Sequence, residues 1–296
     1  TECVSEFNLC GPLTVILILI SLFLGAVFLF AGSFNSILID GLPLFVLCGM
    51  VGFVLHWLIF VPSFIFSTEH YFDLTGSISY VTTVILACLL TPELHIRDII
   101  ISIMVLVWAI RLGSFLFTRV KRDGQDRRFE VMKHRFVWFL MTWTLGGLWV
   151  LVTLCAALAA ITSSNKLDLG VLGILGIVLW CLGFVIEVVA DHQKTQFRKV
   201  PENKDRFISD GLWSWSQHPN YFGEILLWSG VAFLAFPVLS GIQMLTLISP
   251  IFVYLLLTKV SGIPLLDRLA NNKWGDDADY QKYIRSTSKL VLLPPK

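Results

Sequence analysis

The chain has 296 residues, of which 56% are hydrophobic and 15% charged, and its formal net charge is +1. A soluble domain carries roughly 25% charged residues and cannot bury this much apolar surface, so the composition excludes an ordinary soluble protein and indicates a polytopic membrane protein. The near-zero net charge predicts no nucleic-acid partner. None of the six cysteines forms a CxxC pair or a Cys/His pattern with zinc spacing, so we expect buried thiols, with neither disulfides nor a metal site.

Apolar runs predict seven to eight membrane-spanning helices. The first run, 13–31, follows a segment with Glu2 and Glu6 and no Lys or Arg, which is not typical of a signal peptide and favours a retained helix. We therefore predict an all-α polytopic transmembrane helical bundle. The other runs that are long enough, or nearly so, to cross a hydrocarbon core of ~30 Å lie at 43–66, 76–92, 98–118, 136–162, 168–190, 222–238 and 242–260.

Basic residues gather in three segments, 119–135, 191–218 and 262–296. Two predicted spans separate each segment from the next, so all three lie on one side, which the positive-inside rule makes cytoplasmic. The intervening loop 163–168 is short and nearly uncharged, consistent with the opposite side. For most of these Lys and Arg residues, a topology signal is the simplest interpretation.

Two early spans carry candidate residues. Asp73 and Tyr80 are seven residues apart, so they share a helix face if the third span begins early. A phenol near a carboxylate can act as a proton donor, and an aromatic residue of the membrane interface is the alternative. Arg111 lies within the fourth span, eight residues before Arg119. A buried cation should face the bundle interior, where it could pair with a carboxylate, snorkel or reach an anionic cofactor.

The end of the sixth span carries four charged residues, Glu187, Asp191, Lys194 and Arg198, spaced four, three and four residues apart. On a helix they share one face, with the carboxylates nearer the membrane and the cations nearer water. A self-paired stripe is the structural interpretation. The functional one is a wall for a phosphorylated ligand, with Lys194 and Arg198 on phosphate.

A dense polar stretch, 211–224, opens the seventh span. Pro219 predicts that a helix begins here, with Asn220 as its N-cap and Glu224 in the first turn. Glu224 stands at the mouth of a nearly uncharged run, 225–237, where a carboxylate is costly unless it has a partner or a function. A capped helix at the interface is the plainer alternative. The chain has no GxGxxG after a strand, Walker loop, GxSxG or HExxH, so helices and loops must hold any nucleotide.

At these residues the C-terminal part of the chain, 98–296, resembles the membrane reductases of the steroid 5-alpha-reductase C-terminal type, and it is also similar to the sterol C14 and C7 reductases and the lamin B receptor. The resemblance rests on Asp191 to Arg198, on Gly211 to Glu224, on a tail from Trp274-Gly275 through Tyr280 and Tyr283 to Pro294, and on Arg111 to Val120 with Asp126 to Phe129. It implies two regions: N-terminal membrane helices, 1–97, and a reductase-like membrane domain, 98–296.

The resemblance implies that NADPH binds in the cytoplasm-facing half of a helical bundle and that hydride passes to a polarised double bond of a steroid-like or other lipid. Glu224 stands where the family has an acid between nicotinamide and substrate, and Tyr80 is our candidate proton donor. Asp191 replaces an Asn of the sterol reductases, and Gln217 replaces an Arg. The residues that the resemblance and the charge pattern put forward as cofactor ligands are Arg111, Arg119, Asp191, Lys194, Arg198, His218, Asn220, Tyr221 and Tyr280.

Two other functions stay open. The isoprenylcysteine carboxyl methyltransferases, which use S-adenosylmethionine, have a similar R-H-P-x-Y-x-G turn and an acidic pair before the final helix, where this chain has Asp267 alone. A lipid-binding scaffold without catalysis is the third possibility, against which the retained polar residues argue. As an integral multi-pass protein, the chain is expected in the endoplasmic reticulum of a eukaryote or the cytoplasmic membrane of a bacterium.

Overall fold

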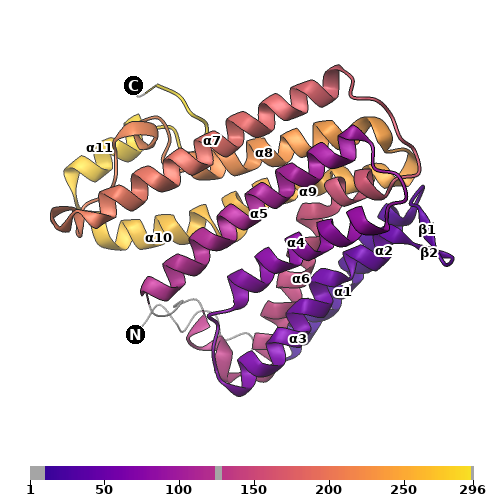
Figure 1. Ribbon diagram of the computed structural model, residues 1–296. Helices are drawn as coiled ribbons and strands as arrows, with labels where there is room; N and C mark the ends of the chain where they lie inside the picture. Colours follow the sequence, from indigo (N-terminus) through magenta and orange to yellow (C-terminus); the bar gives the residue numbers. More distant parts are fainter. Residues whose placement is uncertain (1–10, 124–128, 295–296) are drawn as a thin grey trace. The chain divides into compact units, whose positions relative to one another are not determined.

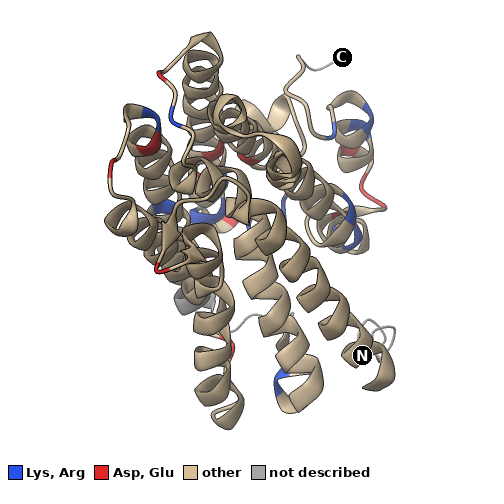
Figure 2. Cartoon of the chain, turned by 90° about the vertical axis from the view of Figure 1, so that its right-hand side faces the viewer, with Lys and Arg blue, Asp and Glu red and all other residues tan. Residues whose placement is uncertain are grey.

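The computed structural model describes the backbone of residues 11–123 and 129–294, and the side chains of 11–118 and 129–294. Eight helical segments among these residues are long and apolar enough to cross a membrane, which confirms the predicted all-α transmembrane bundle. In Figure 2 most of the helical ribbon carries neither charge colour. The segments are Gly11–Ser33, Leu44–Ile65, Phe72–Leu90, Ile96–Thr118, Phe136–Thr162, Val171–Lys199, Pro219–Val238 and Gly241–Trp274.

The chain forms two compact units (Figure 1). Unit 1 comprises 1–169 with 235–248, and unit 2 comprises 170–234 with 249–296. Unit 2 is therefore built from two stretches of sequence that a short insertion, 235–248, separates. The division at 97/98 reflects where the family resemblance begins, which is a different criterion, and it stays a prediction.

Unit 1 is organised around α6 (Phe136–Thr162), whose side chains are buried along most of its length. Glycines let neighbouring helices approach α6 closely. A Cβ on Gly147 would lie 2.9 Å from the Cα of Phe53, and a Cβ on Gly146 would lie 2.6 Å from the ring of His56. The helices and 3-10 turns of unit 1 around α6 are α1 (Gly11–Ser33), α2 (Leu44–Gly49), α3 (Val51–Ile65), α4 (Phe72–Leu90), α5 (Ile96–Asp123), η3 (Met132–His134), η6 (Phe236–Val238) and η7 (Gly241–Ile248).

A two-residue hairpin follows α1. Its strands, β1 (Leu38–Ile39) and β2 (Leu42–Pro43), pair antiparallel. The turn residues Asp40 and Gly41 both have positive φ, 50° and 83°. This is the backbone that an Asp-Gly pair favours in a two-residue hairpin, so the local sequence accounts for the turn.

The end of the first basic segment is anchored in unit 1 by two contacts. Phe129 is buried in an aromatic cluster with Phe60, Phe139 and Trp143. Lys133 Nζ lies 3.0 Å from Glu69 Oε2, and the Glu69 side chain is almost fully buried. This end of the segment therefore has a packing role in addition to its expected effect on topology.

Unit 2 contains a helix pair, α7 (Val171–Lys199) and α8 (Pro219–Ala235), that meets through glycines. A Cβ on Gly183 would lie 2.5 Å from Gly223 O, and a Cβ on Gly176 would lie 2.6 Å from Gly230 O. The two contacts are seven residues apart on each helix, so one stripe of small residues sets the spacing. The other elements of unit 2 are η4 (Pro201–Asn203), η5 (Gly211–Ser214), α9 (Ser249–Leu255), the π-helix η8 (Leu256–Val260), α10 (Ile263–Trp274) and α11 (Ala278–Ser286).

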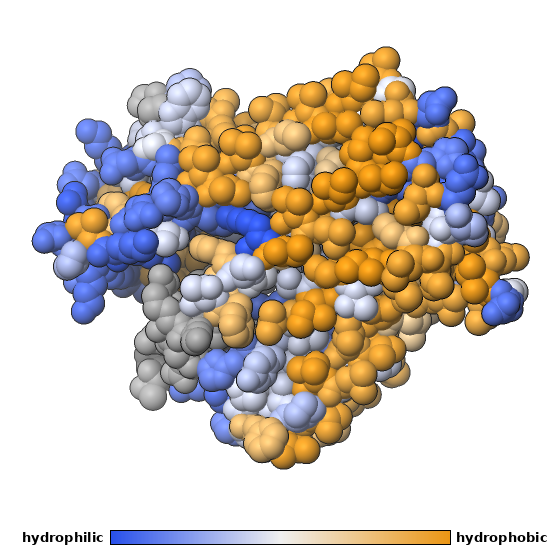
Figure 3. Space-filling view, viewed as in Figure 1, coloured by the Kyte–Doolittle hydropathy of each residue, from blue (hydrophilic) through white to orange (hydrophobic). Residues whose placement is uncertain are grey.

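Polar and apolar surfaces separate within unit 2. In Figure 3 the surface over much of α7 is orange, whereas the surface around α11 is largely blue. The outer face of α7 carries large exposed apolar side chains such as Ile174, Leu182 and Val185. This face is suited to lipid, and the end of the unit that holds α11 is suited to water.

The four described cysteines are free thiols with different surroundings. Cys48 and Cys155 are buried, Cys88 is half-buried and Cys181 is exposed. The expectation of buried thiols is therefore wrong for Cys181, because this small side chain lies on the outer face of α7. Cys3 and Cys10 lie outside the described residues.

Candidate functional site

The charged stripe of α7 shows a gradient of burial. Glu187 and Asp191 are buried, Lys194 is half-buried, and Arg198 is exposed near the end of the helix. The carboxylates thus lie deep and the cations lie nearer water. Lys194 Nζ lies 4.4 Å from the centroid of the Trp213 ring, a cation–π contact that orients its ammonium group.

The turn before α8 differs from the predicted cap. The helix begins at Pro219, as predicted, but His218 is the flanking residue whose carbonyl accepts from Phe222 N at 3.2 Å. Asn220 is the second helical residue and not the N-cap, and Glu224 lies beyond the first turn. Both predictions were wrong because Pro219 occupies the first helical position, where its missing N–H costs nothing.

The side chain of Asn220 points instead to α7. Its Nδ2 donates to Asp191 Oδ1 at 3.1 Å. Its Oδ1 is buried without a hydrogen-bond partner in the described part of the chain. A buried amide oxygen left without a partner is unusual in a folded protein and marks a place where a ligand donor or water can bind.

His218 is the centre of a second set of contacts. Its ring stacks on that of Tyr221, with centroids 5.6 Å apart and planes 9° from parallel. Its Nε2 lies 3.6 Å from Asp267 Oδ1, just outside hydrogen-bond distance, and is buried. Burial lowers the pKa of His218 to about 4; Asp267 opposes this shift, and Lys194 and Lys289 add to it. The imidazole is therefore neutral at physiological pH.

The chain end is hydrogen-bonded to the segment before this turn. We call residues 287–293 the C-terminal strap. Ser216 Oγ donates to Leu290 O at 2.8 Å, Leu293 N donates to Trp215 O at 3.1 Å, and Gln217 Nε2 donates to Thr287 O at 2.8 Å. Gln217, which replaces an Arg of the sterol reductases, thus holds the strap in place.

Tyr280, a predicted cofactor ligand, belongs to an aromatic cluster in unit 2. Its ring lies 5.2 Å from that of Phe207 and 6.0 Å from that of Trp274. Burial, and secondarily the charge of Asp267, raise the pKa of Tyr280 above its usual value. Its neighbour along α11, Tyr283, donates its hydroxyl to Trp213 O at 2.7 Å. Through the Tyr283 hydrogen bond, this aromatic cluster contacts the segment that leads into α8.

The structure assembles part of the predicted set and adds to it. Asp191, Lys194, His218, Asn220 and Tyr221 come together in unit 2, and Glu224 is half-buried on α8 of the same unit. The sequence reasoning missed two residues of this cluster, Asp267 of α10 and Lys289 of the strap, whose side chains pair at 2.5 Å. Asp267 is the only acid between 263 and 274, a signal that could have found it.

Arg198 and Tyr280 also belong to unit 2, whereas Tyr80, Arg111 and Arg119 belong to unit 1. Because α4 begins at Phe72, Asp73 and Tyr80 share a helix face, as expected. Tyr80 is buried with its ring edge-to-face against Trp108, at 5.1 Å between centroids. The Arg111 guanidinium lies 5.4 Å from the centroid of the Phe115 ring. Arg119 lies outside the residues whose side chains are described.

The cluster in unit 2 has groups that can hold an anionic ligand. His218 Nε2 and Asn220 Oδ1 are buried polar atoms with no hydrogen bond to a described residue, so they are available to a ligand. Lys194, one helix over, supplies positive charge beside them. A neutral imidazole, an amide and a cation together can hold an anionic ligand that also carries hydrogen-bonding groups.

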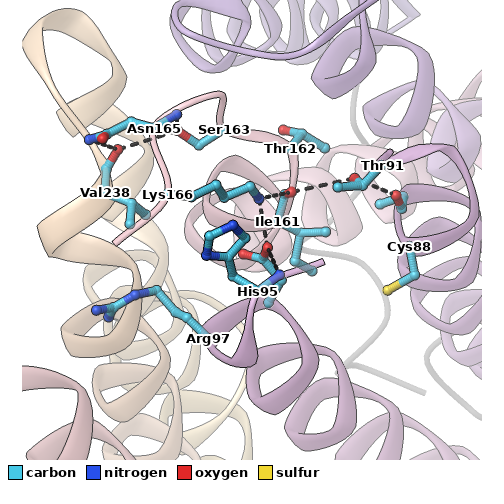
Figure 4. Close-up of polar contacts among 12 residues, drawn as sticks. Cys88, Thr91, His95, Arg97, Ile161, Thr162, Ser163, Asn165, Lys166 and Val238 are labelled. Carbon is cyan, nitrogen blue, oxygen red and sulfur yellow. Dashed lines mark hydrogen bonds and ion pairs between the residues drawn. The ribbon is translucent and has the colours of Figure 1, made fainter. Parts of the chain in front are cut away.

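Unit 1 holds a second buried polar cluster, which we call the loop clasp and which consists of Arg97, Asp98 and Lys166. Figure 4 labels Arg97 and Lys166. Lys166 Nζ lies 2.6 Å from Asp98 Oδ2 and donates to Ile161 O at 2.8 Å. Arg97 donates to Asp168 O at 2.6 Å. The nearly uncharged loop 163–168 therefore connects the end of α6 to the start of α5 through its one cation, Lys166.

Comparison with known proteins places the chain in a family. The model of the family described as "Protein of unknown function (DUF1295)" matches residues 59–287. The chain is 37% identical over 57 residues to 3-oxo-5-alpha-steroid 4-dehydrogenase 1 of Mus musculus, and equally so to that of Rattus norvegicus, which is 19% of this chain and 22% of each relative. It is 29% identical over 126 residues to a probable O-methyltransferase, ustE, of Ustilaginoidea virens, which is 36% of this chain and 44% of that protein.

The chain thus spans between a fifth and a half of the length of these curated relatives, and no solved structure matches it. The family match extends over most of the described residues, from α3 to α11. It confirms the resemblance to steroid 5-alpha-reductase-like proteins that the motifs predicted. This protein therefore belongs to the DUF1295 family and is an integral membrane protein similar to the steroid reductases.

Proposed function

We propose that this protein is an integral-membrane reductase that uses NADPH to reduce an activated double bond of a steroid-like or other lipid. The observation that carries the proposal is the cluster of unit 2, in which His218 Nε2 and Asn220 Oδ1 are buried without hydrogen-bond partners beside Lys194. NADPH, when bound, supplies the hydride, and a proton completes the reduction at the other carbon.

The chain's own residues have distinct roles in this proposal. Lys194 and Arg198 bind phosphate by charge-assisted hydrogen bonds, which are stronger than neutral ones. Asn220 and His218 present an amide and a neutral imidazole to the polar groups of the cofactor, and Tyr221 holds the imidazole by stacking. Glu224, one turn further along α8, orients the nicotinamide amide.

Tyr80 is the proposed proton donor. A phenol donates a proton in its neutral form and returns to that form from solvent or a neighbouring acid. Tyr80 is buried against Trp108, which fixes the direction of its ring. Tyr80→Phe keeps this packing and removes the hydroxyl, so turnover should fall by roughly 10²-fold or more, the scale of a lost acid–base group, with cofactor affinity unchanged.

A methyltransferase that uses S-adenosylmethionine is the second candidate. The similarity to a probable O-methyltransferase spans 126 residues, more than the 57 shared with the steroid dehydrogenases. The unit 2 cluster also contains an acid, Asp267, beside the turn. The reductase is the better match because S-adenosylmethionine has no phosphate for Lys194 and Arg198 to bind.

Ligand stabilisation of the purified protein in lipid nanodiscs tests the proposal. A ligand at a hundred times its Kd stabilises the folded state by about 2.7 kcal/mol, so NADPH should raise the Tm clearly and S-adenosylmethionine should not. Lys194→Gln should weaken NADPH binding by roughly 1.5–3 kcal/mol. Lys199→Gln, which removes an exposed cation from the same helix end, is the matched control and should bind normally.

The opposite ligand preference would overturn the reductase proposal and favour the methyltransferase. Stabilisation by neither ligand would favour a scaffold without this chemistry. Glu224→Gln provides a separate check on catalysis, because it preserves volume: turnover should fall roughly 10²-fold with NADPH affinity within about tenfold. Full turnover in that variant would remove Glu224 from the proposed mechanism.

A further inference from the structure

The C-terminal strap places a cation at the cluster of unit 2. Backbone and side-chain hydrogen bonds on both sides of Lys289 fix its position: Gln217 N donates to Ser288 O at 2.8 Å, and Ser216 Oγ donates to Leu290 O at 2.8 Å. The backbone of Lys289 is therefore held in place on both sides. Its Nζ lies 2.5 Å from Asp267 Oδ2.

Two cations from distant parts of the sequence act on the same imidazole. Asp267 bridges Lys289 to His218, since one of its oxygens pairs with Lys289 and the other lies 3.6 Å from His218 Nε2. Lys194 of α7 acts on the same ring, and both lysines contribute to lowering the pKa of His218. Lys289 is thus one carboxylate away from a buried imidazole whose Nε2 lacks a hydrogen bond to any described residue, and Lys194 adds positive charge near the same ring.

The ion pair between Lys289 and Asp267 contributes little to the stability of the fold. The Lys289 side chain is 59% exposed and that of Asp267 30% exposed. Ion pairs at this exposure contribute little, because water and salt screen them. An incoming anion could therefore replace Asp267 as the partner of the Lys289 ammonium with little loss of folding free energy. The exposed ammonium is accessible to an anion from the water side.

We infer that Lys289 is a phosphate ligand of the cofactor cluster, which Asp267 holds in place until an anion replaces that carboxylate as its partner. The inference rests on the proposed function for the identity of the cofactor, but the chemistry it names is a phosphoryl group alone. It assigns opposite effects to the two partners: Lys289 attracts the anion, and Asp267, whose charge has the same sign as phosphate, opposes it.

Binding of inorganic pyrophosphate to the full chain in nanodiscs tests the inference directly, with competition at several salt concentrations. Lys289→Gln should weaken binding roughly 5- to 10-fold and flatten its salt dependence, as the loss of one exposed charge-assisted hydrogen bond requires. Lys289→Arg should restore most of the affinity. Asp267→Asn should strengthen binding, roughly 2- to 5-fold, because it removes a repulsive charge.

Lys282→Gln is the matched control, since Lys282 is an exposed cation of α11 just before the strap, outside the cluster. It should leave pyrophosphate affinity unchanged. Equal losses in the Lys289→Gln and Lys282→Gln proteins would mean a general surface-charge effect and would overturn the inference. Weaker binding in Asp267→Asn would also overturn it, because the pair would then be a structural support of the site.

The inference and the proposed function can fail separately. If pyrophosphate binding responds to Lys289 and Asp267 as expected but NADPH is neither bound nor oxidised, the phosphate site stands and the reductase fails. If NADPH is turned over normally by Lys289→Gln at an unchanged KM, the reductase stands and the assignment of Lys289 fails. Acetylation of Lys289, followed by mass spectrometry, gives a third readout: pyrophosphate should protect Lys289 and leave Lys282 reactive.

Discussion

The two buried polar clusters of this protein differ in how their members are paired. In the loop clasp of unit 1, Asp98 accepts from Lys166 and from the backbone of His95, and Lys166 also donates to a carbonyl. In the cluster of unit 2, His218 Nε2 and Asn220 Oδ1 are equally buried but have no hydrogen bond to a described residue. The first cluster pairs its charges internally, and the second leaves polar atoms open.

This difference separates support from recognition. Buried polar groups in native proteins are almost always hydrogen-bonded, so a cluster that pairs its own members needs nothing further and stabilises the fold. A cluster with open buried atoms is less stable than it could be, and such a cost is expected where a ligand completes the pairing. Burial and charge alone would not distinguish the two, since both clusters contain buried carboxylates and a lysine.

The largest expected effect comes from breaking the loop clasp. Lys166→Ala removes the ion-pair partner of the buried Asp98, which should destabilise the protein by about 3–5 kcal/mol. Thermal unfolding in nanodiscs measures this as a large fall in Tm. Lys273→Ala removes the cation of an exposed ion pair with Asp205 and provides the control, which should unfold nearly as the wild type does.

The Lys166→Ala protein also tests whether the loop clasp affects ligand binding. If the clasp is purely a support, the folded fraction of Lys166→Ala should bind NADPH with wild-type affinity. A loss of affinity per folded molecule would contradict the assignment of fold support to the loop clasp and of ligand binding to the unit 2 cluster. An unchanged Tm would mean that Asp98 does not depend on Lys166.

A smaller effect is expected from protonation of His218. Its pKa is lowered to about 4 in the folded protein from 6.5, mainly because burial disfavours the charged ring. The unfolded chain therefore binds more protons between these values, so stability contributed by the neutral ring is fully present above pH 6.5 and falls as the pH drops towards 4. The full loss amounts to about 3 kcal/mol.

Unfolding of the wild type and of His218→Gln across pH 4–7 isolates this contribution. The difference between their free energies of unfolding should change across the window from 6.5 to 4 and be flat above it. A difference that is constant with pH would mean that the ring titrates normally in the folded protein. NADPH should oppose the loss if it binds the neutral ring, because a bound ligand favours the folded state.

Features that depend on local sequence patterns could be predicted, whereas contacts between helices could not. The eight spans follow from apolar runs alone, because the bilayer thickness sets their length. The face shared by Glu187, Asp191 and Lys194 follows from helical periodicity. The prediction of Asn220 as N-cap was wrong, because Pro219 prefers the first helical position and therefore places Asn220 inside the helix. The Asn220 amide donates to Asp191 on α7 instead.

The pairing of residues from distant segments could not be predicted from the sequence, although Asp267 stands out as the only acid of its helix. Asp267 and Lys289 lie 22 residues apart, and the strap that carries Lys289 is held by hydrogen bonds to residues 215–217. Gln217 replaces an Arg of the sterol reductases, and the sequence alone indicated no role for the Gln. The structure gives the Gln a role of its own, since both Ile284 O and Thr287 O accept from its Nε2.

The smallest expected effect concerns the support of the strap. The hydroxyl of Tyr283 donates to Trp213 O at 2.7 Å, and burial raises the pKa of this phenol, so it stays neutral at physiological pH. Tyr283→Phe removes one neutral hydrogen bond and should cost about 1 kcal/mol, a fall of a few degrees in Tm. Because Trp213 also lies beneath Lys194, affinity for pyrophosphate should fall slightly as well, by roughly 2- to 3-fold.

Tyr71→Phe, which removes an exposed hydroxyl in unit 1, is the control and should change neither quantity. A Tm loss in Tyr283→Phe as large as that of Lys166→Ala would show that the unit 2 cluster supports the fold as strongly as the loop clasp does, and the contrast between them would not hold.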